Sequence, residues 1–401
     1  MKNILLTTLL ISIVIFTSCK EKVTNPPDIP LPEGYQQDIP WPSLADSPWP
    51  INHGDPQSTG RSKFVGPLLG VLNKVVETLE LNSGIVIGKD SSIFCSSSQL
   101  LQGGLYSFTS DYKLKWKLNT SESYETPIIA KDSTIYFMDV NSLFAVKSDG
   151  TIKWTYQIEP GNLQIRGLTI GLDGTLYFID GNKSLNAINP NGSRNWSMTD
   201  NRFYPWGNNG LVFAPDGKTL YTTSHDNAVL AIDVINKSIK WIFTYKQVDL
   251  PVPPIVDCQG NIYINAKNEK NEIYFYSLKS DGTIRWQYQT NDTILYQPTI
   301  DKMGNLYLAS SKLYSLDYTG NLRWKIDMGK PSGCALVCDA EGTVYAGVDS
   351  QTLEIYAIDS SGKIKWVLND ASYGALSGSP ALMLHTLLQT SSNSANFFII
   401  K

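Results

Sequence analysis

Short apolar runs separated by turn-forming residues recur along most of this chain. Leu143–Val146, Val229–Ile232 and Ile355–Ile358 are examples, and each is followed closely by a polar turn. Many of these turns contain Asp-Gly or a related pair, which signals a hairpin when it lies between apolar runs. The pattern therefore predicts an all-β chain of short antiparallel strands, with the apolar runs forming the core.

The strands belong to an internal repeat that is marked by tryptophan. Seven of the ten tryptophans follow the same kind of polar turn, namely Trp116, Trp154, Trp196, Trp241, Trp286, Trp324 and Trp366. Successive members are 38, 42, 45, 45, 38 and 42 residues apart. A period of about 42 residues with four strands per unit is typical of a β-propeller, whose blades stack because no blade can bury both faces alone.

We expect these seven tryptophans to be structural docking residues that lie between one blade and the next. An aromatic side chain buries roughly 200 Å² at such an interface. The alternative interpretation is a platform on which a cofactor stacks. Seven equivalent residues cannot all face one axial site, so the structural role is favoured.

The repeat resembles the tryptophan-docking repeat of PQQ-like β-propellers. The resemblance is carried by Ala145–Trp154, Ser315–Trp324 and Ala357–Trp366, and by Ala231–Trp241, which is one residue longer. The opening segment Ser47–Ser62 is similar to the start of bacterial proteins of that family. The resemblance extends to the C-terminus and implies a PQQ-like propeller, but it says little about function because the repeat is structural.

The length of the repeat region predicts eight blades. Residues 68–401 number 334, and 334 divided by about 41.7 is 8.0. An eighth tryptophan would lie beyond the last residue, so residues 379–383, 386–389 and 396–401 are expected to be the first three strands of a blade. The segment Leu72–Leu81 would supply the fourth strand and close the ring. Seven blades with a C-terminal extension are the alternative.

The first residues are typical of an export signal. A lysine at position 2 precedes an apolar run, Ile4–Phe16, that is too short to span a bilayer. The sequence Phe16-Thr-Ser-Cys19 resembles the lipobox of bacterial lipoproteins, which implies a signal peptide at residues 1–18 and lipidation of Cys19. Lys20 favours the outer membrane. The alternative is an ordinary signal peptide followed by a chance cysteine.

Residues 19–50 are predicted to be a Pro-rich tether between the lipid anchor and a propeller at residues 51–401. Proline is frequent from position 26 to position 50, and apolar periodicity is almost absent. Such segments tend to extended polyproline geometry, at about 3 Å per residue. A Pro-rich ligand for another domain is disfavoured because no P-x-x-P register with basic neighbours is present.

Charge and candidate ligands exclude several classes of function. Lys+Arg 33 minus Asp+Glu 37 gives −4 without a basic stripe, which argues against nucleic-acid binding. His53, His225 and His385 lie too far apart for metal-ligand spacing, so zinc catalysis and histidine-based triads are disfavoured. The aspartates that could serve as catalytic carboxylates are expected to be turn residues instead, namely Asp149, Asp173, Asp216 and Asp281.

A quinone-dependent dehydrogenase is the enzyme alternative that the repeat raises. By resemblance, such enzymes hold Ca²⁺ beside the quinone and often carry two adjacent cysteines. Cys95, Cys258, Cys334 and Cys338 are not adjacent, and we expect four unpaired, mostly buried thiols. The sequence therefore predicts a protein without a cofactor, metal or catalytic site, and the dehydrogenase is kept as the less favoured reading.

The remaining candidate is a binding surface on the loops between blades. Aromatic and arginine side chains are the usual anchors of protein interfaces. The candidate binding residues are Tyr124, Glu125, Arg166, Tyr204, Trp206, Tyr296, Gln297 and Tyr373. We expect them to gather at one mouth of the propeller and to bind a partner off the axis, over blades 2 to 4.

The lipid anchor, tether and propeller together resemble the BamB-type family of outer-membrane assembly factors. The resemblance implies a non-catalytic, monomeric lipoprotein scaffold that contacts the membrane through Cys19 and a protein partner in the cell envelope. Its Pro-rich tether differs from that family, so a role in barrel assembly is analogy. The alternative is a propeller that binds or senses a small molecule or a glycan.

Overall fold

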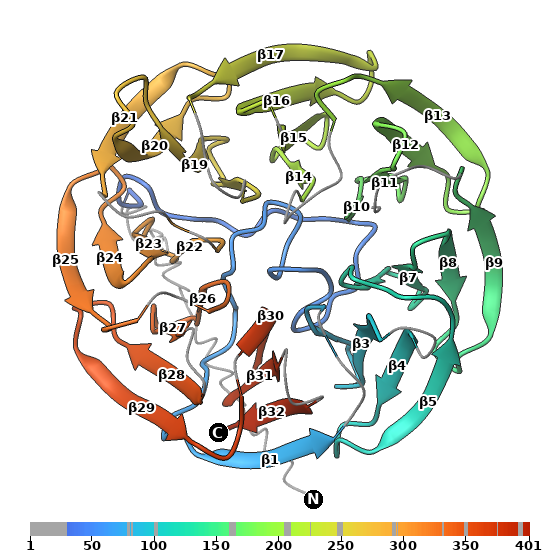
Figure 1. Ribbon diagram of the computed structural model, residues 1–401, viewed down its shortest axis with the longest axis horizontal. Helices are drawn as coiled ribbons and strands as arrows, with labels where there is room; N and C mark the ends of the chain where they lie inside the picture. The colour runs from blue at the N-terminus through green and yellow to red at the C-terminus, as the bar shows by residue number, and fades with distance from the viewer. Residues whose placement is uncertain are drawn as a thin grey trace, which may run out of the picture. The chain divides into compact units, whose positions relative to one another are not determined.

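The computed structural model contains one compact unit, Glu33–Lys401, in which every element is a β-strand. Eight four-stranded sheets surround a common axis (Figure 1). The prediction of eight blades is therefore confirmed, and the seven-blade alternative is wrong. No helix among the described residues is long and apolar enough to cross a membrane. The described residues are 30–77, 81, 83–99, 103–159, 166–203, 210–224, 226–246, 252–290, 294, 296–330, 333–348, 352–374, 376–391 and 396–401.

Blades 1 to 7 follow one another along the chain, and in each the first strand lies innermost. Blades 1 and 2 are β2 (Val86–Ile87), β3 (Ile93–Ser97), β4 (Gly104–Phe108), β5 (Leu114–Asn119), and β6 (Ile128–Ile129), β7 (Ile135–Met138), β8 (Ser142–Val146), β9 (Ile152–Gln157). Blades 3 and 4 are β10 (Arg166–Ile170), β11 (Leu176–Ile179), β12 (Ser184–Ile188), β13 (Arg194–Thr199), and β14 (Val212–Phe213), β15 (Thr219–Ser224), β16 (Ala228–Asp233), β17 (Ser238–Thr244).

The second half of the ring repeats this arrangement. Blades 5 and 6 are β18 (Ile255–Val256), β19 (Ile262–Lys267), β20 (Ile273–Leu278), β21 (Ile284–Gln289), and β22 (Thr299–Ile300), β23 (Leu306–Ala309), β24 (Lys312–Leu316), β25 (Leu322–Asp327). Blade 7 is β26 (Val337–Cys338), β27 (Val344–Gly347), β28 (Leu353–Ile358), β29 (Ile364–Asp370), and blade 8 combines β30 (Leu376–Met383), β31 (Thr386–Ser391), β32 (Asn396–Ile400) with β1 (Leu72–Glu77).

Burial along the strands explains the sequence pattern. Strand β8 is buried at all five positions, because the middle of a blade packs against neighbouring blades on both faces. Strand β9 at the rim instead alternates between exposed and half-buried residues. The predicted acidic turn residues have the expected local role, since the carboxylate of Asp149 accepts the backbone N–H of Thr151 at 2.9 Å.

The repeated tryptophans pack across the seams between blades. The indole of Trp116 lies against Gly150, where an added Cβ would approach the ring to 2.9 Å, so only glycine fits there without a shift. Six indole N–H groups donate to a backbone carbonyl of the following blade at 2.9 to 3.2 Å: Trp116 to Ser148, Trp154 to Pro190, Trp241 to Ser280, Trp286 to Tyr318, Trp324 to Ser360 and Trp366 to Pro67. Trp196 packs against Tyr177, with ring centroids 5.8 Å apart.

Blade 8 closes the ring by joining the two ends of the repeat region. Strand β1 pairs with β32 in antiparallel register, from Leu72 opposite Ile400 to Glu77 opposite Asn396. Phe397 and Phe398 of β32 are fully buried. The closure expected from the sequence is therefore confirmed, with the outer strand contributed by the N-terminal side.

The predicted tether differs from the structure between Glu33 and Pro50, because this stretch packs onto the propeller. Trp41 is 8% exposed and Trp49 is 1% exposed. Apolar side chains between the prolines are thus buried against the inner strands, and the compact unit begins at Glu33 instead of residue 51. Figure 1 shows this part of the chain, in blue, running across the middle of the ring. We call residues 36–65 the strap.

The strap forms hydrogen bonds with all eight blades. Most of these bonds involve the last residue of an inner strand, whose backbone groups at the axis have no neighbouring strand. The bonds join Trp49 to Ile87, Ala45 to Ile129, Trp41 to Ile170, Pro56 to Phe213, Gln57 to Val256, Thr59 to Ile300, Gly60 to Cys338 and Val65 to His385. The strap therefore covers the mouth at which the inner strands end.

Candidate functional site

The loops between blades enter the inner strands from the mouth opposite the strap, because all inner strands run in the same direction along the axis. Two of the predicted binding residues lie in the loop before blade 2. The hydroxyl of Tyr124 donates to the carboxylate of Glu122 at 2.7 Å. The Glu125 carboxylate accepts the backbone N–H groups of Gly167 and Leu168 at 3.1 and 3.3 Å. Glu125 therefore joins blade 2 to blade 3.

Other predicted residues also contact their own chain. Tyr373 packs edge-on against Phe398, with ring centroids 5.3 Å apart, and thereby supports blade 8. Gln297 is 8% exposed, and its side-chain amide donates to the Ser58 hydroxyl at 2.8 Å. Tyr296 beside it is half-buried. These partners give Gln297 and Tyr373 structural roles that the sequence pattern did not indicate.

The rest of the predicted surface is described only in part. Arg166 is the first residue of β10. It directly precedes Gly167 and Leu168, whose backbone N–H groups donate to Glu125. Tyr204 and Trp206 lie outside the described residues. The gathering of all eight residues at one mouth therefore stays a prediction.

The centre of the propeller is filled by part of the strap. His53 is fully buried, and its two ring nitrogens lie 2.6 and 2.7 Å from the carbonyl oxygens of Ser58 and Leu336. Burial lowers the pKa of His53, although both carbonyls favour the charged ring. Because Ser58 also contacts Gln297, this turn reaches from the covered mouth to the start of the inner strands.

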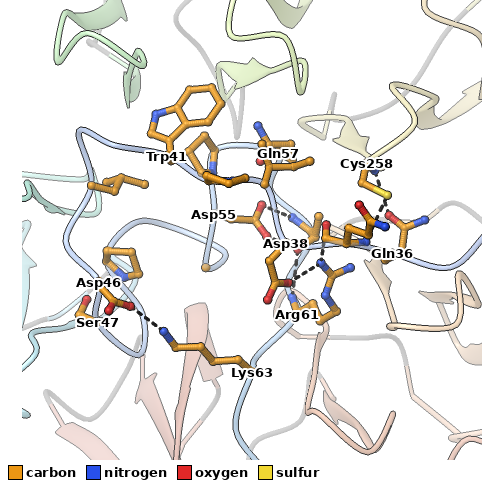
Figure 2. A pocket seen from close by; sticks show the side chains of 18 of the residues that line it. Gln36, Asp38, Trp41, Asp46, Ser47, Asp55, Gln57, Arg61, Lys63 and Cys258 are labelled. Atoms are coloured by element: carbon orange, nitrogen blue, oxygen red, sulfur yellow. Dashed lines mark hydrogen bonds and ion pairs between the residues drawn. The ribbon is translucent and has the colours of Figure 1, made fainter. Parts of the chain in front are cut away.

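A cavity of about 290 Å³ lies between the strap and blade 5 (Figure 2). Figure 2 shows Arg61 and Lys63 on different sides of it, with Asp55 near the middle. Trp41 and several prolines supply an apolar part of the lining, and Val256 and Cys258 come from blade 5. Sequence reasoning missed this site because it assigned most of the lining residues to a free tether.

Two ion pairs at the cavity join the first part of the strap to its last part. Arg61 contacts Asp38 at 3.0 Å, and Lys63 contacts Asp46 at 2.9 Å. Lys63 lowers the pKa of Asp46 through this contact. Burial raises the pKa of Asp55, whose carboxylate accepts both the backbone N–H and the hydroxyl of Thr59.

The four cysteines in the described part of the chain have free thiols. Cys95, Cys334 and Cys338 are buried, and Cys258 is half-buried against the strap. The expectation of unpaired, mostly buried thiols is confirmed. Burial raises the pKa of Cys334 to about 12, which disfavours the reactive thiolate.

Together, the ring of blades, its closure and the tryptophan seams define a β-propeller of the PQQ-like class. A family model described as outer membrane protein assembly factor BamB matches residues 61–288, which is 228 of the 401 residues. The chain therefore belongs to this family. No curated protein matches the chain.

Solved structures with this fold include proteins of different activity. BamB from Moraxella catarrhalis is 13% identical, with a TM-score of 0.62 over 83% of this chain and 100% of that chain. The quinohemoprotein alcohol dehydrogenase from Comamonas testosteroni is 10% identical, with a TM-score of 0.66 over 88% of this chain and 80% of that chain. Sqt1 from Saccharomyces cerevisiae is 11% identical, with a TM-score of 0.65 over 84% and 99%. Likeness at this level shows the fold alone.

The quinone site that the dehydrogenase resemblance implies would need a ligand set for Ca²⁺ near the axis. Near the axis lies the His53 ring of the strap, whose nitrogens contact the carbonyl oxygens of Ser58 and Leu336. Within the described ranges, no three His, Cys, Asp or Glu side chains are placed to hold a metal ion together.

Proposed function

We propose that this protein is a non-catalytic scaffold of the cell envelope that binds another protein through its propeller. Membership of the BamB family supports this proposal. The observation that carries it is the strap, which crosses the middle of the ring and bonds to every blade. A disc stabilised in this way offers a rigid surface, and rigid surfaces lose little entropy on binding.

The partner surface in this proposal is the mouth opposite the strap. The covered mouth presents strap backbone that is already bonded to the blades. The opposite mouth is reached by the loops that carry the half-buried Tyr124, Tyr296 and Tyr373. Tyrosine and arginine at such positions are common interface anchors. Blades 2 to 4, with Arg166 at the start of β10, are the preferred region.

The protein is anchored to the outer membrane in this proposal. Signal cleavage after residue 18 and acylation of Cys19 supply several acyl chains, which give stable anchoring where one chain is marginal. The chain between Cys19 and Glu33 then serves as the tether. Mass spectrometry of the mature protein purified from membranes tests this directly. An unmodified Cys19, or cleavage at another bond, contradicts the anchor.

The biological role carried over from the family is assembly of outer-membrane proteins. The test is cross-linking and capture of the full-length lipoprotein in its native envelope. We expect capture of envelope proteins, reduced in a variant carrying Trp206→Ala and Arg166→Ala, at a loss of about 2 kcal/mol of binding free energy. Asp46→Asn on the strap side is the matched control and should capture normally. Undiminished capture by the double variant contradicts this partner surface.

The enzyme alternative has its own test. Pyrroloquinoline quinone with Ca²⁺ should leave the melting temperature and the absorbance spectrum of the protein unchanged, because no three His, Cys, Asp or Glu side chains among the described residues are placed to hold a metal ion together. Saturable binding accompanied by dye-linked alcohol oxidation would show a quinone dehydrogenase instead.

A further inference from the structure

Arg61 is a buried cation whose hydrogen-bonding capacity is only partly used by the described residues. Its side chain is 8% exposed and lines the cavity beside blade 5. One terminal nitrogen, Nη2, donates to Asp38 at 3.0 Å and to the Gln37 carbonyl at 3.5 Å. The other, Nη1, is buried and has no partner among the described residues. An unpaired buried donor is unfavourable, so this guanidinium is suited to a further acceptor.

The carboxylate that forms the ion pair with Arg61 belongs to an exposed side chain. Asp38 is 81% exposed and contacts only Nη2, through one carboxylate oxygen. A guanidinium can bind a planar anion with two parallel N–H groups, which is stronger than a single contact. Asp38 is exposed and held by this single contact, so a carboxylate that arrives from solution can replace it on Arg61.

The rest of the cavity fits a small and partly apolar molecule. Its volume of about 290 Å³ lies just below the usual range for ligand pockets, about 300–1,000 Å³, and suits a small ligand. Trp41, Pro56 and Val256 line it, and the indole N–H of Trp41 is already bonded to the Ile170 carbonyl, which leaves the lining ring an apolar contact. Asp55 also interacts electrostatically with Arg61, and Thr59 donates to both of its carboxylate oxygens.

We infer that this cavity binds a small organic carboxylate, with the carboxylate on the Arg61 guanidinium and the apolar part against Trp41 and Pro56. Asp38 occupies the anion position until the ligand displaces it. The same chemistry is presented by a free organic acid and by the C-terminal residue of a peptide. This site lies on the strap side of the propeller, so it is separate from the proposed partner surface and does not depend on it.

The test is calorimetric titration of the full-length mature protein with benzoate and with benzamide, its uncharged isostere. We expect saturable binding of benzoate and none of benzamide, because only the carboxylate pairs with Arg61. N-acetylphenylalanine serves as the mimic of a peptide C-terminus. If it binds more tightly than benzoate, the source is a peptide; if it binds less tightly, the source is a free acid. Both results support the carboxylate site.

Three variants locate the binding. Asp38→Asn should tighten benzoate binding, because it removes the competing carboxylate without changing a buried group. Asp46→Asn is the matched control, since it makes the same charge change on the pair with Lys63, and it should have a smaller effect. Arg61→Lys keeps the charge but loses the planar pair of donors, and should weaken binding by about tenfold.

Several outcomes overturn the inference. Absence of saturable benzoate binding at millimolar concentration excludes the site, as does equal binding of benzamide. If Asp38→Asn and Asp46→Asn change the affinity equally, the anion is not on Arg61. Because the Asp38→Asn comparison touches only exposed carboxylates, it remains decisive even where Arg61→Lys disturbs the fold.

Discussion

The side-chain amide of Gln297 donates a 2.8 Å hydrogen bond to the hydroxyl of Ser58, which lies 239 residues earlier in the chain. Gln297 belongs to the loop that enters blade 6, whereas Ser58 belongs to the strap. The bond is buried, so it joins two segments inside the propeller where water does not compete for either group. One contact thus links the covered mouth to the opposite one.

The first prediction concerns this bond. Gln297→Leu should lower the free energy of unfolding by about 1–2 kcal/mol, because the Ser58 hydroxyl loses its amide donor in a buried site. Urea denaturation measures the change. Ser58→Ala and the double variant complete the cycle, and the two substitutions should be less than additive. Strict additivity would show that the two side chains do not interact.

The second prediction concerns the attachment of the strap. Trp49 is 1% exposed and its backbone carbonyl accepts the N–H of Ile87 in blade 1. Trp49→Ala should cost about 3–5 kcal/mol through lost burial and a cavity. Trp49→Phe is the control: it should cost only about 1–2 kcal/mol, because the lost indole N–H has no partner among the described residues.

Equal, small effects of both Trp49 variants in denaturation experiments would contradict a packed strap. Such a result would restore the sequence-based expectation that residues 19–50 act as a free tether. It would also remove the wall of the cavity beside blade 5, because most of its lining belongs to this segment.

The blades could be predicted from the sequence repeat, whereas the packing of the strap could not. Each tryptophan turn occupies the same place in its blade, so spacing alone located strands such as β9 and β29 and the closing pair of β1 and β32. The strap has no repeat, and its prolines indicated an extended chain. An extended chain is nevertheless the form that can pair with the ends of eight inner strands in succession.

The candidate site was only partly predictable for a related physical reason. Gln297 was correctly placed in a loop between blades, but its partner Ser58 is non-local and no pattern announces such a contact. Glu125 was predicted to be a binding residue, and its carboxylate accepts two backbone N–H groups of blade 3. Trp41 and Trp49 could have indicated that the strap is packed, because two such hydrophobic side chains are unusual in a solvated tether.

The third prediction concerns the closure of the ring. Deleting Asn396–Lys401 removes β32, which separates β1 from β31 and exposes an edge. The melting temperature of the whole propeller should fall sharply in calorimetry. Deleting Lys401 alone is the control: β32 ends at Ile400, so this deletion removes only the two backbone hydrogen bonds with Val71 and should have a smaller effect. A shortened protein that melts like the intact one would contradict closure through blade 8.

The last prediction concerns pH and follows from His53. Burial lowers the pKa of this fully buried ring below its ordinary value of 6.5. The unfolded chain therefore takes up the proton at a higher pH than the folded protein does. The resulting stabilisation is fully present above pH 6.5, and it is lost as the pH falls from there toward the lower folded-state pKa.

Denaturation at pH 7.5 and pH 5.5 measures this effect, and His53→Gln isolates it because glutamine does not titrate. The wild-type protein should lose more stability than the variant between these two pH values. Asp55 acts in the opposite direction, since burial raises its pKa above 3.8 and the corresponding stability is lost as the pH rises. Asp55 is retained in both proteins, so the difference between them reports on His53 together with its electrostatic interaction with Asp55. A larger loss in His53→Gln than in the wild-type protein would mean that the two carbonyls, of Ser58 and Leu336, hold the ring in its charged form.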